Sequence, residues 1–154
     1  GQRTAEAIQA DLAKVGITAE ITTFEWGTYL DKLGNGDHEA ALIGWNGDNG
    51  DPDNFLYTLL GADNARKGSA SNYAFYRDPT VNRILKEARL VEDRESRSAL
   101  YRQAQARLNE DAPVVPLFHS TQLLAFSEEV EGFVMMPVGD LNFHTVDLRP
   151  KEKL

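Results

Sequence analysis

The spacing of apolar residues along the first 60 positions switches between the repeat of a helix and that of a strand. The first set recurs every three or four residues, as on one face of an α-helix: Ala5, Ile8, Leu12 and Val15. We expect this helix to start with Thr4 as its N-cap and to end at Gly16, which suits a left-handed C-terminal cap. Residues 18–24 alternate roughly and are rich in β-branched side chains, which predicts a strand directly after the helix.

The alternation of helix and strand continues to residue 60. A helical pattern from Trp26 to Leu33 ends at Gly34-Asn35-Gly36, and a continuous apolar run follows at residues 40–43. A run without polar alternation predicts a strand that is buried on both faces. A second apolar segment, Phe55 to Leu60, begins behind Pro52 and predicts another helix. This order indicates an α/β fold, in which ligands commonly bind at the ends of strands.

The rest of the chain has a different texture. Residues 61–77 contain few large apolar groups and predict a surface loop. Asp78-Pro79 and Asp93 are typical helix starts, and each precedes a helical apolar pattern. After Pro113, short β-like runs replace the helical periodicity: residues 114–118, 123–126 and 133–136. We expect this C-terminal part to belong to a different sheet from the first 110 residues.

Composition narrows the possible functions. The chain has 154 residues, of which 42% are hydrophobic, and a net charge of −8. We expect no nucleic-acid partner, because phosphate binding draws on a basic surface. The absence of cysteine excludes thiol catalysis, disulfides and zinc–thiolate sites, and no apolar run approaches the roughly 20 residues of a membrane helix. The start at Gly1, with neither a methionine nor a secretory leader, suggests a processed protein or a piece of a longer one.

The most distinctive segment is a glycine-rich loop. Residues 43–55 are Ile-Gly-Trp-Asn-Gly-Asp-Asn-Gly-Asp-Pro-Asp-Asn-Phe. Asp51 suits the N-cap of the following helix, Pro52 its first position and Asp53 the positive end of its dipole, so these three have structural interpretations. Asp48 lies three residues before the cap, where no capping role is evident. A carboxylate there is either solvated in the loop or held in a cleft with a cationic partner, since an unpaired buried charge is costly.

Trp45, at the end of the predicted strand, also has two interpretations. It is either a residue of the core or one wall of a side-chain pocket, because ligand sites are largely apolar with a few convergent polar groups. The loop brings together a carboxylate, a large aromatic side chain and free backbone amides. We therefore expect it to capture a small solute that carries an amine.

Other chemistries fit the loop less well. An EF-hand beginning at Asp48 needs glycine at the sixth position and glutamate at the twelfth, where the chain has Asp53 and Leu59. The acids of the loop could be paired for glycoside hydrolysis, but nothing in the sequence supplies the second half of such a site. The usual hydrolase, zinc-protease and phosphate-loop motifs are also absent. The histidines are scattered without a partnered motif: His38, His119 and His144. We expect no enzymatic activity, no metal and no cofactor.

The segment from Gly44 to Phe55 closely resembles the ligand loop of bacterial dipeptide-binding proteins. These are extracytoplasmic receptors of ABC importers, in a family that also takes up oligopeptides, nickel and glutathione. The likeness extends across nearly the whole chain, because further stretches resemble sequence patterns of the family: residues 7–16, Glu25 to Leu30, Leu100 to Gln105, and Ala112-Pro113 with His119-Ser120-Thr121.

The resemblance implies a fold and a division of the chain. Members of the family have a two-lobed, type II periplasmic-binding-protein-like fold, with a mixed sheet flanked by helices, and they are far longer than this chain. The chain is therefore expected to be a C-terminal portion. Residues 1–115 would belong to the second, ligand-binding lobe, and residues 116–154 would cross the hinge and return to the first lobe.

The resemblance also implies roles for four residues of the loop. Asp48 would pair with the α-ammonium of a dipeptide, and Trp45 would line a side-chain pocket. Backbone groups near Gly44 and Asn46 would hydrogen-bond the extended peptide, which fixes any peptide while roomy, wet pockets accept many side chains. The arginine for the peptide's carboxylate would lie upstream of Gly1.

The implied function is that of a dipeptide receptor in the periplasm, or anchored on the outer side of the cytoplasmic membrane. Its partners would be the dipeptide, an ABC permease and the remainder of the parent receptor. One alternative keeps the fold and changes the ligand to glutathione, haem or a longer peptide. An alternative of a different class is a stand-alone metal or interaction module built on the acidic loop.

Overall fold

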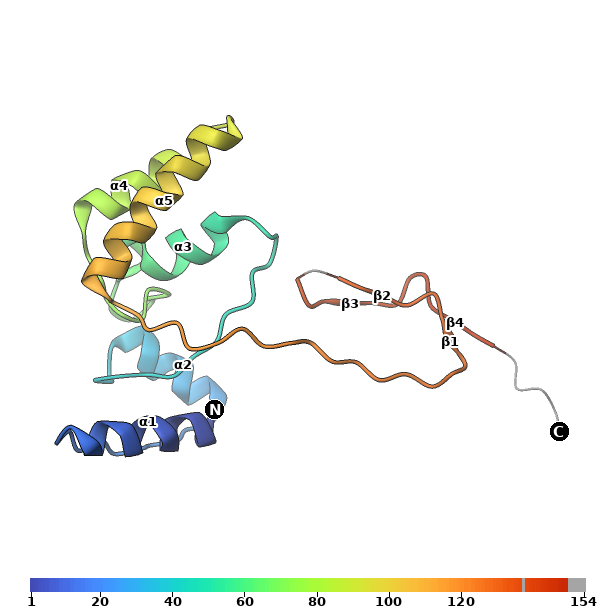
Figure 1. Cartoon of the computed structure of the whole chain (residues 1–154), viewed down its shortest axis with the longest axis horizontal. Helices are drawn as coiled ribbons and strands as arrows, with labels where there is room; N and C mark the ends of the chain where they lie inside the picture. Colours follow the sequence, from blue (N-terminus) through green and yellow to red (C-terminus); the bar gives the residue numbers. More distant parts are fainter. Residues whose placement is uncertain (137, 150–154) are drawn as a thin grey trace.

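The computed structural model describes residues 1–136 and 138–149 (Figure 1). The helices in chain order are α1 (Gln2–Lys14), α2 (Trp26–Asn35), α3 (Pro52–Leu60), the 3-10 helix η1 (Ala62–Asn64), α4 (Pro79–Ala88) and α5 (Arg94–Asp111). The strands are β1 (Val130–Glu131), β2 (Val134–Met135), β3 (Leu141–Asn142) and β4 (Asp147–Leu148). Within these described ranges, no helix is long and apolar enough to span a membrane.

The first predicted helix forms, but its predicted start is wrong. α1 begins at Gln2, so Thr4 lies inside the helix and is not its N-cap. The predicted end is confirmed, because Gly16 has a φ of +82°. The Ile17 amide donates to the Leu12 carbonyl at 3.0 Å, which satisfies a carbonyl of the last turn as a Schellman motif does. No residue of α1 is buried, so its apolar stripe is not covered by the described residues.

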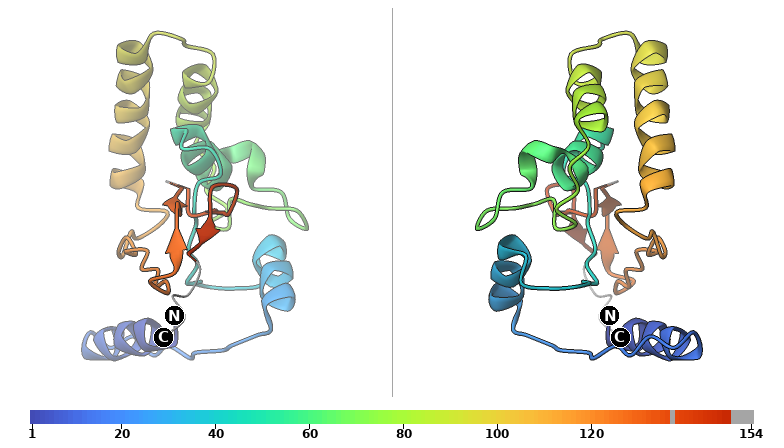
Figure 2. Two further views of the ribbon diagram at one scale, coloured as in Figure 1. Left: turned by 90° about the vertical axis from the view of Figure 1, so that its right-hand side faces the viewer. Right: turned by 90° about the vertical axis from the view of Figure 1, so that its left-hand side faces the viewer.

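The core lies where α3, α4 and α5 pack together (Figure 1). α4 and α5 run antiparallel, side by side (Figure 2). The buried residues come from all three helices: Leu60, Val81, Ile84, Leu85, Ala88, Tyr101, Ala104 and Leu108. The apolar faces predicted for the two later helices therefore meet each other. Burial of these side chains, rather than helix propensity, stabilises such short helices.

Both later helices begin at the residues predicted from the sequence. Asp78 Oδ1 accepts a hydrogen bond from the Val81 amide at 2.8 Å, and Asp93 Oδ2 accepts one from the Ser96 amide at 2.8 Å. Each carboxylate satisfies an amide that has no partner within the helix. The hydrogen bond to the Val81 amide is the main reason that the pKa of Asp78 lies below its usual value.

Two predicted strands do not join a sheet here. Residues 18–24 and 40–43 have no regular secondary structure, and the ladders among the described residues are antiparallel, β1 with β4 and β2 with β3. The expectation that residues 40–43 are buried on both faces is wrong for this chain, in which Ile43 is 39% exposed. A strand is buried by its neighbours and by the helices on its faces, and none of the described residues takes those places.

The part of the chain after α5 extends away from the helices (Figure 1). Ala112 ends α5 in the left-handed conformation, with a φ of +46°. No strand is assigned over the predicted runs at 114–118 and 123–126, and their large apolar side chains are exposed: Val114, Val115, Leu117, Phe118, Leu123, Leu124 and Phe126. The run predicted at 133–136 contains β2, so a strand there is confirmed.

Candidate functional site

The glycine-rich loop leads into α3 through the cap that the sequence predicted. Asp51 is in the extended conformation, and its Oδ1 accepts a hydrogen bond from the Asp53 amide at 2.8 Å. Pro52 takes the first helical position, where a missing amide proton costs nothing. Asp53 lies in the first turn, at the positive end of the helix dipole. The structural roles of these three residues are confirmed.

Asn54, also in the first turn of α3, organises the loop. Its side-chain oxygen accepts hydrogen bonds from Trp45 Nε1 at 3.3 Å and from the Asp48 amide at 3.0 Å. Its Nδ2 donates to Asp48 Oδ2 at 3.1 Å. One amide side chain therefore brings two of the predicted site residues together. Asn54 was missed as a site residue because, in the sequence, it is one more polar residue at a helix start.

The other predicted site residues lie at the open side of the loop. Gly44 and Asn46 are exposed, and within the described part of the chain their backbone groups make no hydrogen bond. Trp45 is 38% exposed, which places it outside the core. Gly50 has a φ of +71°, a conformation that glycine adopts without strain. The loop therefore presents free backbone groups and an accessible indole ring.

Asp48 differs from the neighbouring acids in its charge environment. Arg97 forms an ion pair with Asp51, and Arg89 Nε lies 3.2 Å from Asp53 Oδ1. Asp48 is exposed and is held by the neutral amide of Asn54. Among the residues that the structure describes, no cationic side chain lies within 4.0 Å of its carboxylate. The loop thus holds a carboxylate in a fixed place with no counter-charge of its own.

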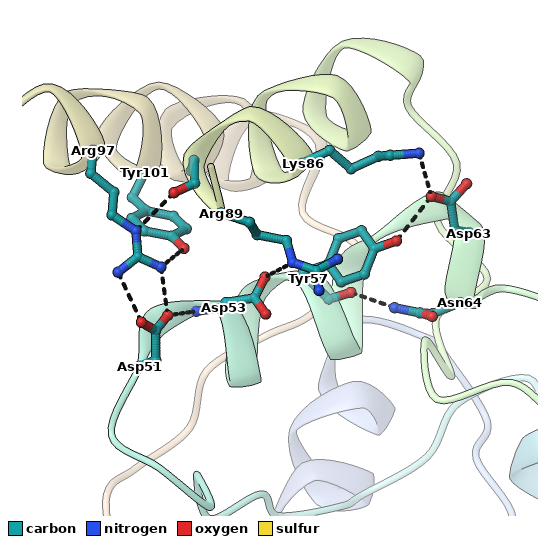
Figure 3. A network of polar contacts seen from close by, with 10 residues as sticks. Asp51, Asp53, Tyr57, Asp63, Asn64, Lys86, Arg89, Arg97 and Tyr101 are labelled. Atoms are coloured by element: carbon teal, nitrogen blue, oxygen red, sulfur yellow. Dashed lines mark hydrogen bonds and ion pairs between the residues drawn. The ribbon is translucent and has the colours of Figure 1, made fainter. Parts of the chain in front are cut away.

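A network of polar contacts connects the start of α3 to the other two helices of the core (Figure 3). Arg97 of α5 donates to both carboxylate oxygens of Asp51, each at 2.8 Å. It also donates from Nε to the Ala88 carbonyl at 2.8 Å and from Nη2 to the Tyr101 hydroxyl at 3.1 Å. The Arg97 hydrogen bonds, helped by the Asp53 amide, hold the pKa of the Asp51 carboxyl below its usual value.

The same network continues along α3 and α4 (Figure 3). The Arg89 guanidinium that pairs with Asp53 also lies over the Tyr57 ring, 4.6 Å from its centroid. The Tyr57 hydroxyl donates to Asp63 Oδ2 at 3.0 Å, and Lys86 Nζ lies 3.1 Å from that oxygen. Burial, followed by the hydrogen bond to Asp63, raises the pKa of the Tyr57 phenol. These contacts give Asp53 of α3 and Asp63 of η1 a cationic partner each.

Nothing in the described ranges 1–136 and 138–149 resembles a metal centre. No group of three or more histidine, cysteine, aspartate or glutamate side chains is arranged there to hold an ion. His38 Nε2 lies 3.0 Å from the Tyr73 carbonyl, which is a structural contact. His119 and His144 are exposed and lie in other parts of the chain.

The ion pair between Asp51 and Arg97 predicts a loss of stability in acid. The folded-state pKa of Asp51 is below the ordinary value of 3.8, so the unfolded chain binds this proton at a higher pH than the folded chain does. The contribution of this ion pair to the stability of the fold is therefore fully present above about pH 3.8. It is lost as the pH falls through the lower folded-state pKa of Asp51. We expect Asp51→Asn to unfold at a lower temperature than wild type near neutral pH and to lose less stability on acidification. Thermal unfolding across this pH range measures both, and parallel losses in the two proteins would contradict the prediction.

Known proteins match nearly the whole chain. A family model described as bacterial extracellular solute-binding proteins, family 5 middle, matches residues 1–67. A dipeptide-binding protein of Pseudomonas aeruginosa is 43% identical over 146 residues, which are 95% of this chain and 27% of that protein. Heme-binding protein A of Haemophilus influenzae is 39% identical over 150 residues, which are 97% of this chain and 27% of that protein. The chain thus spans about a quarter of the length of these relatives.

Solved structures match the fold over the same range. The ABC transporter-associated periplasmic binding protein DppA from Helicobacter pylori, in complex with peptide STSA, aligns with a TM-score of 0.87 and 39% identity. The alignment covers 96% of this chain and 29% of that one. The predicted fold class, part of a type II periplasmic-binding-protein-like fold, is confirmed by this match. The ladders that the described residues form among themselves are only short antiparallel pairs.

Proposed function

The chain is related in sequence and in fold to the bacterial extracellular solute-binding proteins of family 5, and from this premise we propose that it supplies one wall of a peptide-binding cleft. The whole protein is a receptor for dipeptides that acts outside the cytoplasm and delivers its ligand to an ABC importer. It binds its ligand and releases it unchanged, so it is not an enzyme. Residues 1–115 belong to the ligand-binding lobe, and residues 116–154 pass through the hinge to the first lobe.

The observation that carries this proposal is the state of Asp48. Its carboxylate is fixed by Asn54 but has no cationic partner among the described residues, whereas Asp51 and Asp53 each have an arginine. The α-ammonium of a dipeptide is a cation that can pair with this carboxylate and donate hydrogen bonds to it. A hydrogen bond between two charged groups is among the strong ones, and it strengthens further when the closing lobe excludes water.

The neighbouring residues supply the rest of the recognition. Gly44 and Asn46 offer backbone groups that make no hydrogen bond within the described part of the chain, so an extended peptide can pair with them. Trp45 offers an accessible apolar ring whose orientation is fixed by the bond from Nε1 to Asn54. Backbone pairing is independent of sequence, and a ring wall accepts many side chains. This combination suits a receptor that takes many different dipeptides.

The proposal is tested by changing the charge of the ligand's amine. We expect calorimetric titration of the full-length protein to show binding of Ala-Ala and weakening by at least about tenfold for N-acetyl-Ala-Ala, because acetylation removes the charge that pairs with Asp48. Glutathione keeps an α-ammonium, whereas haem has none, so each is titrated as a separate ligand. Equal binding of the free and the acetylated dipeptide would contradict the amine clamp. Binding of haem alone would assign the protein to the haem branch of its relatives.

A further inference from the structure

The loop that carries Asp48 has few attachments of its own. Residues 44–50 are not buried. Within the described part of the chain, their side chains and amides form hydrogen bonds only with Asn54 and with the Asp51 amide. Both partners lie at the start of α3. The position of the Asp48 carboxylate is therefore set by the position of the first turn of α3.

That first turn is held from the opposite side by Arg97 (Figure 3). Its guanidinium contacts Asp51 at the N-cap of α3, the carbonyl of Ala88 at the end of α4, and Tyr101 on its own helix α5. The side chains of Arg97 and Asp51 are only 25% and 35% exposed. A single planar group thus ties three helices together at the point where the ligand loop enters the core.

We propose that Arg97 is a positioning residue for the ligand loop, which acts through Asp51 and Asn54 to hold the Asp48 carboxylate at a fixed place; this inference rests on the proposed function. The two intermediate residues are three positions apart on the same helical turn, so they move together. Displacement of Asp51 therefore displaces the Asn54 amide, which bonds both Asp48 and Trp45. Among the described residues, Arg97 itself makes no hydrogen bond or ion pair with residues 44–50.

The geometry requires arginine rather than a general positive charge. Two nitrogens of the guanidinium each donate to a different oxygen of Asp51 at 2.8 Å, and the third nitrogen, Nε, donates to the Ala88 carbonyl. Lysine offers one flexible ammonium and cannot reproduce this fork. The substitution Arg97→Lys therefore keeps the charge and removes the orientation.

The test compares Arg97→Lys with Arg83→Lys in the full-length protein. Arg83 makes an exposed ion pair with Glu87 within α4 and has a side chain that is 66% exposed, so it serves as a matched control. We expect Arg97→Lys to raise the dissociation constant for Ala-Ala by about tenfold, and Arg83→Lys to leave it within about twofold of wild type. Both are measured by calorimetry well below the unfolding temperature of each variant.

A second readout follows the loop without any ligand. The printed sequence contains two tryptophans, Trp26 and Trp45. Replacing Trp26 by phenylalanine leaves Trp45 as the reporter of the ligand loop within this sequence. We expect acrylamide to quench Trp45 more strongly in Arg97→Lys than in Arg83→Lys, because the hydrogen bond from Nε1 to Asn54 loosens. In a full-length protein with further tryptophans, those residues are also replaced by phenylalanine, so that the emission comes from Trp45 alone.

The outcomes separate the inference from the function on which it rests. A raised Kd for Ala-Ala together with increased quenching of Trp45 supports the positioning role. A non-additive change in the binding free energy when Arg97→Lys is combined with Asn54→Ala supports it further. A lowered Tm with an unchanged Kd and unchanged quenching means that Arg97 only stabilises the fold, which overturns the inference. If the wild-type protein binds no dipeptide, the proposed function fails, and the quenching of Trp45 alone decides whether Arg97 positions the loop.

Discussion

Asp48→Asn is expected to weaken the binding of an unblocked dipeptide by about tenfold to a hundredfold. This corresponds to the usual contribution of a hydrogen bond between charged groups to the free energy of binding. Asparagine has nearly the same shape, and its side-chain oxygen still accepts the hydrogen bond that Asn54 Nδ2 donates to Asp48 in the wild type. The loop is therefore retained while the charge is removed. Calorimetric titration of the full-length variant with Ala-Ala measures the change, and a fall of the effect with added salt would reflect its electrostatic origin.

The control for this variant is Asp37→Asn. Asp37 is an exposed aspartate just after α2, and none of its side-chain atoms has a hydrogen bond or ion pair within the described part of the chain. The same change of charge there is expected to leave the affinity unchanged. N-acetyl-Ala-Ala supplies the second control. It has no charged amine, so its affinity for wild type and for Asp48→Asn is expected to be similar. Undiminished affinity of Asp48→Asn for Ala-Ala would exclude Asp48 as the clamp.

The largest loss of stability is expected from Leu85→Ala. Leu85 is fully buried at the centre of the contact between α3, α4 and α5. Truncation removes apolar contacts and leaves a cavity that the surrounding helices fill only in part. The free energy of unfolding should fall by about 2–5 kcal/mol, the usual range for such a substitution. Urea unfolding of the full-length variant measures this fall.

Leu90→Ala is the matched control for the core substitution. Leu90 lies just beyond the end of α4, and its side chain is 85% exposed. The chemical change is the same, but no cavity forms, so the free energy of unfolding should stay within about 0.5 kcal/mol of wild type. Similar losses at the two positions would show that α4 does not pack on its neighbours as described.

Local features of the chain could be predicted from the sequence because the interactions that create them join residues only a few positions apart. Asp51 with Pro52, Asp78 and Asp93 each start a helix through a bond to an amide two or three residues later. Gly16 ends α1 because glycine adopts a positive φ without strain. The start of α1 was predicted wrongly because Thr4 has the chemistry of a cap, yet the helix continues through it to Gln2.

The likeness of residues 44–55 to a known ligand loop also came from the sequence alone, and it indicated the family that the fold and the relatives then matched. The roles of Asp48, Trp45, Gly44 and Asn46 in binding stay predictions. A motif shows which groups are offered, because its order along the chain is visible. It does not show how those groups are held.

Only the tertiary structure decided how the loop is held and what is buried. Arg97 and Asp51 are 46 positions apart, and no periodicity connects two residues whose contact depends on how α5 packs against α3. Burial is decided in the same way, since residues 40–43 have the composition of a central strand and yet are largely exposed where no neighbour covers them. The sequence by itself determined the starts of α3, α4 and α5, the C-terminal cap of α1 and the chemistry of the loop. The packing of the helices decided the surroundings of each side chain, because charge pairing and burial depend on distance in space.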